Sequence, residues 1–171
     1  MRKLIALAVV FCFVASAFPL AVDDGDSRAL FEFHRLTPVV APFTGNTNPI
    51  RGLGGGGIPW RIRSGHAELN ASGRLEVHVR GLVLNAGPNA GTNPIAKFAA
   101  ILSCQSVNTS ENAPAPAILN LVAGVASATA AGDADIEGTV SLPSPCIAPI
   151  VFVAIPATST ASARWLAASG F

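Results

Sequence analysis

Two histidines and two glutamates stand at matching positions in the two halves of the stretch Ser64–Leu84. His66 and Glu68 lie in the first half, and Glu76 and His78 lie in the second. Imidazole nitrogens and carboxylate oxygens are ligands for ions such as zinc and copper. If the fold brings these four side chains together, they predict a site for a divalent metal.

The apolar residues of the same stretch predict that it is a β-hairpin. Leu75, Val77 and Val79 alternate with polar residues, a period of two that is typical of a half-buried strand. The segment Asn70–Gly73 between the two halves has turn composition, and glycine suits the left-handed position of a three-residue hairpin loop. This loop makes the apolar faces of the two strands coincide.

The predicted register also aligns the polar face. It places His66 opposite His78 and Glu68 opposite Glu76. Directly opposed residues have Cβ atoms about 4.5–5.5 Å apart, close enough for their side chains to share one ion. The competing interpretation is a solvated strand face whose glutamates are neutralised by nearby arginines.

A second set of carboxylates occurs at Asp133, Asp135 and Glu137, followed by Gly138. The order D-x-D-x-E-G resembles the first half of a calcium-binding loop. The twelfth position is Ser144, where such a loop has a bidentate glutamate. Calcium binding and a solvated strand face are therefore the two interpretations of this segment.

The N-terminus has the pattern of a secretory signal peptide. A basic start, Met1–Lys3, precedes an apolar run to Val14, and Ala15–Ala17 has the A-x-A form of a cleavage site. We expect residues 1–17 to be removed and the protein to be secreted, into the medium or onto the cell surface. The apolar run is shorter than the about 20 residues that a membrane span needs, so we expect no membrane span after cleavage.

Signal cleavage changes the cysteine count and the charge. Cys104 and Cys146 remain, and in an exported protein an even pair predicts a disulfide, which we expect to link the two sheets of the fold. The alternative is two separate buried thiols. Cleavage also leaves 9 Lys and Arg residues against 10 Asp and Glu. A near-neutral chain without a basic patch argues against nucleic acid as a partner.

The remainder of the chain predicts an all-β domain. Short apolar or alternating runs are separated by Gly, Pro and Asn turns, without convincing amphipathic helices. Ile118–Ala128 suits a strand or a helix, and we predict a strand because its neighbours are strands. Residues 58–171 are expected to form an antiparallel β-sandwich, immunoglobulin-like or Greek-key, with about seven or eight strands and one disulfide. Residues 18–57 are expected to be an N-terminal extension with a Gly-rich loop.

The sequence contains two possible glycosylation motifs and lacks two common motifs of nucleophilic enzymes. Two sequons begin at Asn70 and Asn108 in predicted turns, where glycosylation would occur only in a host that performs it. The motifs G-x-S-x-G and S-x-x-K of nucleophilic enzymes do not occur. We therefore expect a non-catalytic protein without a cofactor, unless the His/Glu cluster holds a divalent metal.

Four motifs resemble a group of small secreted bacterial proteins with no assigned function. They are G-G-G-x-P-W at Gly55–Trp60, R-G-L-V-L at Arg80–Leu84, T-N-P-I at Thr92–Ile95, and L-P-S-P-C-I-A-P-I-V-F-V at Leu142–Val153. The similarity covers most of the mature chain and implies no activity and no functional residues. The pattern at Gly73–Leu82 is also similar to strands of other secreted β-sandwiches such as CHRD-type domains.

These observations lead to two hypotheses of different classes. The first is a secreted, non-catalytic β-sandwich with a surface, interaction or structural role and an extracellular protein or carbohydrate partner. The alternative is a metal-binding protein or metal-dependent enzyme that uses His66, Glu68, Glu76 and His78. The metal content of the exported protein distinguishes the two.

Overall fold

The computed structural model describes residues 28–108 and 114–169, and the predicted signal peptide at residues 1–17 lies outside them. Eight of the described strands have five or more residues, in agreement with the predicted seven or eight, and four have two or three. The strands are β1 (Ala29–Phe33), β2 (Leu36–Pro38), β3 (Gly54–Gly55), β4 (Trp60–Arg61), β5 (Ser64–Asn70), β6 (Arg74–Arg80), β7 (Val83–Leu84), β8 (Lys97–Asn108), β9 (Ala115–Ser127), β10 (Ala134–Thr139), β11 (Ile147–Ile155) and β12 (Arg164–Ser169).

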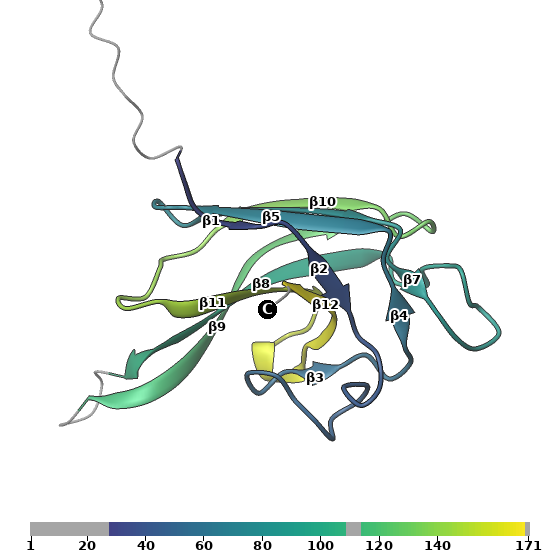
Figure 1. Ribbon diagram of the computed structural model, residues 1–171, viewed down its shortest axis with the longest axis horizontal. Coiled ribbons are helices and arrows are strands. Elements are labelled where there is room, and N and C mark those ends of the chain that lie inside the picture. The colour runs from purple at the N-terminus through teal and green to yellow at the C-terminus, as the bar shows by residue number, and fades with distance from the viewer. Residues whose placement is uncertain (1–27, 109–113, 170–171) are drawn as a thin grey trace, which may run out of the picture.

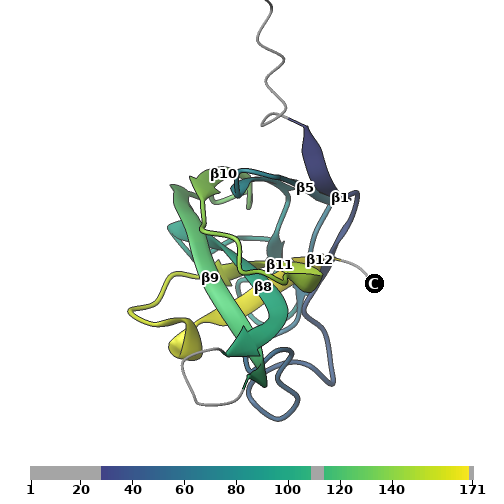
Figure 2. The same cartoon turned by 90° about the vertical axis from the view of Figure 1, so that its left-hand side faces the viewer.

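The strands form two main sheets that lie one above the other as a β-sandwich (Figure 1). The upper sheet in Figure 1 has the order β1-β5-β6-β10, and the lower one has the order β2-β12-β11-β8-β9, with β3 beside β12. All pairings are antiparallel except that of β3 with β12. Figure 2 shows the same two layers from the side. The predicted all-β sandwich is confirmed.

The β5–β6 hairpin has the predicted register. Leu69 pairs with Leu75, and Ala67 pairs with Val77, so that the inward side chains of the two strands are buried together. Gly73 has a φ of 86°, the left-handed conformation that was expected for the last loop residue. The apolar residues that alternate along these two strands in the sequence are therefore the ones that enter the core between the sheets.

The long hairpin of β8 and β9 forms much of the second sheet. β8 lies between β9 and β11, and Phe98 and Leu102 on it are fully buried. The segment Ile118–Ala128, which suits a helix by its alanine and leucine content, is a strand except for its last residue. Pairing along the whole of β8 decides its conformation, because the backbone groups on the β8 side of this edge strand gain partners there.

The described part of residues 18–57 contributes strands to both sheets. β1 pairs with β5 at the edge of the four-stranded sheet, and β2 and β3 both pair with β12. These strands have five residues or fewer, which is too short for a clear periodic pattern. The only helix in the described part of the chain is the 3₁₀ turn Thr160–Ser162, and it has neither the length nor the apolar content to cross a bilayer.

The predicted disulfide between Cys104 and Cys146 is present, but its place in the fold differs from the expectation. Cys104 lies on β8, and Cys146 immediately precedes β11, the hydrogen-bonded neighbour of β8. The expectation that the bond links the two sheets is wrong, because the chain has already returned from β10 to the larger sheet when it reaches Cys146. The bond closes a loop that contains β9 and β10.

The two sheets approach each other most closely where β9 passes β10. A Cβ added to Gly138 would overlap the backbone oxygen of Ala123, and a Cβ on Gly124 would overlap the backbone oxygen of Glu137. Only glycine leaves room for this contact between backbones. The pair of glycines therefore sets where β10 lies, and with it one edge of the four-stranded sheet.

We expect Gly138→Ala to lower the free energy of unfolding by about 1–3 kcal/mol, because the added methyl group forces the two strands apart. Gly57→Ala is the matched control, since a Cβ there would have no neighbour within 4 Å, and it should change stability by less than about 0.5 kcal/mol. Urea unfolding of both variants measures the difference. Equal stabilities would contradict the close contact.

Reduction of the disulfide should also lower the free energy of unfolding, by about 2–4 kcal/mol, because the closed loop restricts the unfolded chain. Thermal unfolding with and without a phosphine reductant tests this. The double variant Cys104→Ala and Cys146→Ala is the control, and its melting temperature should not respond to the reductant. A wild-type protein that melts at the same temperature in both conditions would refute the expectation.

Candidate functional site

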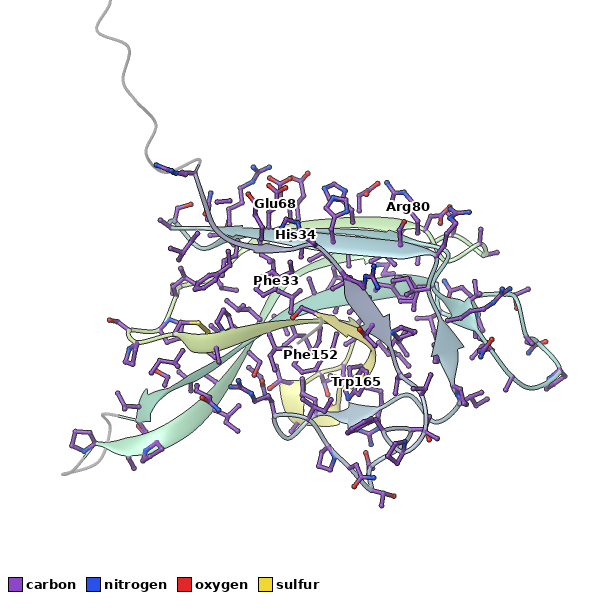
Figure 3. The ribbon with its side chains drawn as sticks, in the orientation of Figure 1. Phe33, His34, Glu68, Arg80, Phe152 and Trp165 are labelled. Carbon is purple, nitrogen blue, oxygen red and sulfur yellow. A yellow bond between two sulfur atoms is a disulfide. The ribbon has the colours of Figure 1, made fainter. Side chains whose placement is uncertain are left out.

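The outer side of the four-stranded sheet carries most of the ionisable side chains whose chemistry the sequence analysis singled out. Figure 3 shows His34, Glu68 and Arg80 on this side, whereas Phe33 points between the sheets. We call this outer side the polar face. Its ionisable members are Glu32, His34, His66, Glu68, Arg74, Glu76, His78, Arg80, Asp135 and Glu137.

One row of the polar face consists of four glutamates on four adjacent strands. Glu32 pairs with Glu68, Glu68 pairs with Glu76, and Glu76 pairs with Glu137. Like charges directly opposite each other destabilise a sheet unless cations lie between them. The row therefore concentrates negative charge across the whole width of the sheet.

Arginine neutralises only half of this row. Arg74 contacts Glu76 and also donates a hydrogen bond to Glu137, with 3.1 Å between Nη2 and Oε2. At the other end, the carboxylate of Glu32 lies 3.7 Å from Nε2 of His34, and Glu68 has no ion pair with any described residue. The β1–β5 half of the row remains the more negative.

The neighbouring row contains imidazoles. His66 pairs with His78 across β5 and β6, and their rings are stacked with centroids 4.7 Å apart and planes inclined by 27°. His34 follows β1 at the same end of the sheet and lines a hollow of about 620 Å³ together with His66. All three histidines of the chain thus occur on the polar face.

Asp135 on β10 orients the second of the stacked rings. It pairs with His78, and its Oδ1 lies 2.7 Å from Nδ1 of that ring. Arg80 donates two further hydrogen bonds to the same carboxylate, at 2.8 and 3.0 Å. The hydrogen bonds from His78 and from Arg80 lower the pKa of Asp135. A carboxylate accepts hydrogen bonds, so this contact favours the tautomer of the neutral ring that carries its proton on Nδ1.

The predicted metal cluster is partly assembled. The structure brings His66 against His78 and Glu68 opposite Glu76, as the register predicted. Among residues 28–108 and 114–169, however, no group of three or more His, Cys, Asp or Glu side chains is arranged to hold a metal ion. Metal binding by all four side chains therefore stays a prediction.

The carboxylates of the calcium-like segment have separate partners. Asp133 precedes β10 and accepts a hydrogen bond from the backbone of Gly81, whereas Asp135 and Glu137 lie along the strand and bind Arg80 and Arg74. An extended strand spaces them along a line and does not wrap them around one point. Calcium binding by these three residues also stays a prediction.

The two sequon asparagines lie at strand ends. Oδ1 of Asn70 accepts hydrogen bonds from the hydroxyl of Ser72 and from the backbone of Arg74 within the hairpin turn. Asn108 ends β8, and the two residues that complete its sequon lie outside the described residues. Glycosylation at either position stays a prediction.

Two contributions to the polar face were not predicted. Glu32 and His34 lie beside the hairpin, and Phe31 and Phe33 alternate with them in the manner of a strand. Asp135 joins the face because β10 pairs with β6. Both pairings join segments that are distant in sequence, so local patterns do not reveal them.

No protein family, curated protein or solved structure matches this chain. The assignment of a function therefore rests on the geometry and charge of the polar face.

The lowered pKa of Asp135 predicts that the free energy of unfolding depends on pH. Because its pKa is lowered in the folded state, its stabilising effect is complete above the ordinary aspartate value of about 4 and is lost as the pH falls through the folded-state pKa. The wild-type protein should therefore lose more stability between about pH 5 and about pH 2 than Asp135→Asn does. The side chain is largely exposed, so the difference is modest. Urea unfolding at both pH values measures it, and equal losses would refute it.

Proposed function

We propose that this protein is a secreted, non-catalytic β-sandwich that binds an extracellular protein through the polar face. The observation that carries the proposal is the row of four glutamates, Glu32, Glu68, Glu76 and Glu137, on four neighbouring strands. The partner surface that fits it presents lysine or arginine side chains.

The energetics of the row support binding. Facing carboxylates cost stability, and a sheet whose outer face served only solubility would gain by alternating the signs of charge along the row. Arg74 does this at the β6–β10 end, whereas Glu32 and Glu68 have no arginine or lysine partner among the described residues. Cationic groups of a partner would supply the missing charge and lower this repulsion.

Secretion is part of the proposal. The signal-like N-terminus and the disulfide between Cys104 and Cys146 both fit an oxidising compartment outside the cytosol. A binding role also fits the construction of the face, because a sheet held on its other side by a packed core presents its side chains on a rigid surface.

A synthetic peptide of alternating lysine and glycine tests the charge and the place of the site. We expect it to shift the backbone NMR signals of β1 and β5 at low ionic strength, and the affinity to fall with added salt. The double variant Glu32→Gln and Glu68→Gln should weaken binding at least fivefold. A glutamate-glycine peptide should not bind.

Glu137→Gln is the matched control for this experiment. It removes a carboxylate of the same row that Arg74 already neutralises, so its effect on peptide affinity should be less than twofold. An equal loss in both variants, or signal changes centred on the larger sheet, would contradict the proposal.

A further inference from the structure

We infer that His66 and His78 form a binding site for one transition-metal ion, copper(II) in preference to zinc(II), and that Asp135 is its positioning residue. The inference concerns the row of imidazoles and does not depend on a cationic partner at the row of glutamates. It develops the metal-binding alternative raised by the sequence, with two protein ligands in place of four.

The distance between the rings suits a shared ion. Their centroids are 4.7 Å apart, and the stacked rings face each other across two hydrogen-bonded strands. Two imidazole nitrogens that bind one ion at about 2.0–2.1 Å in adjacent positions lie about 3 Å apart. Because Asp135 holds the His78 ring, the site requires that the His66 ring turn about its side-chain bonds until one of its nitrogens reaches this separation from Nε2 of His78.

The hydrogen bond between His78 and Asp135 has the arrangement that is usual for a metal-binding histidine. A metal binds an imidazole nitrogen that carries no proton, and the other ring nitrogen usually donates its proton to a carboxylate or a carbonyl. Nδ1 of His78 lies 2.7 Å from Oδ1 of Asp135, and Arg80 holds the same carboxylate in place. Nε2 of His78 is therefore available, and the ring has a fixed orientation.

The sheet fixes the backbone of both ligand residues before an ion arrives. β5 lies between β1 and β6, and β6 lies between β5 and β10, so each histidine is on a strand that is hydrogen-bonded on both sides. The flanking inward residues Ala67 and Val77 are buried in the core. Binding therefore requires reorientation of the His66 side chain and little ordering of the backbone.

The ligand set favours copper. Imidazole binds both copper(II) and zinc(II), and a site of given nitrogen ligands binds copper(II) more tightly. Two nitrogens with water in the remaining positions suit the tetragonal geometry of copper(II). The hollow beside His66 gives solvent access on one side, and Glu68 and Glu76, one outward position along each strand, add negative charge near the ion.

Copper(II) titration followed by electron paramagnetic resonance tests the site on the full chain. We expect one equivalent to bind with a spectrum showing two coordinated nitrogens, and zinc(II) to compete only at higher concentration. His66→Ala and His78→Ala should each raise the Kd for copper(II) at least tenfold. Backbone NMR spectra of the variants verify that they remain folded.

His34→Ala is the matched control. It removes an exposed histidine from the same face, one whose described contact is Glu32 and not the stacked pair, so copper affinity should change less than twofold. A loss as large as that of His66→Ala would overturn the two-histidine site. Binding of one equivalent by the double variant His66→Ala and His78→Ala would overturn it as well.

The variant Asp135→Asn tests whether Asp135 positions the His78 ring for the metal or only supports the fold. The amide can no longer stabilise the protonated Nδ1 as a carboxylate does, so copper affinity should fall about tenfold. The nitrogen NMR shifts of the His78 ring in the metal-free protein should report a mixture of the two neutral tautomers in this variant and a single one in the wild type. Unchanged shifts together with unchanged affinity would refute the role of Asp135.

Discussion

The register of β5 against β6 is the constraint on which both sides of the four-stranded sheet depend. Side chains of a strand alternate between its two faces, so a slip of one residue would turn Leu75 and Val77 into solvent and bury Glu76 and His78. Burial of each large apolar side chain is worth about 1.5–3 kcal/mol, and a buried unpaired charge costs more than that. The core thus decides which polar residues face each other, although none of them contributes to it.

The contact between β9 and β10 determines where β10 lies in the four-stranded sheet. Gly124 and Gly138 let the backbones of the two sheets meet, and β10 then lies beside β6 with Asp135 next to His78. The chain passes from β9 in one sheet to β10 in the other, and the disulfide at Cys104 anchors the loop that makes this excursion. The orientation of one imidazole therefore depends on packing at the far side of the sheet.

Local patterns made half of the polar face predictable. The hairpin could be derived because its turn and its two strands are contiguous, and its register follows from one alternation. The places of Glu32 and Asp135 could not, because β1 and β10 pair with strands that are far away in sequence and pairing at such a distance leaves no local signal. The same reason explains why the disulfide was predicted correctly but its place in the fold was not. The pair was identified from the number of cysteines, whereas the strand order that makes Cys104 and Cys146 neighbours is a property of the whole fold.

The polar face is also a grid with two different spacings. Neighbouring strands are about 4.7–4.9 Å apart, whereas successive outward residues of one strand are about 6.6 Å apart. Across the strands the glutamate row repeats one chemical group, a carboxylate, whereas along β5 the group changes from an imidazole at His66 to a carboxylate at Glu68. A molecule with evenly repeated positive groups can match this surface when it lies perpendicular to the strands and loses the match when it is turned by a right angle. For the proposed cationic partner, the sheet therefore presents a preferred direction as well as a charge.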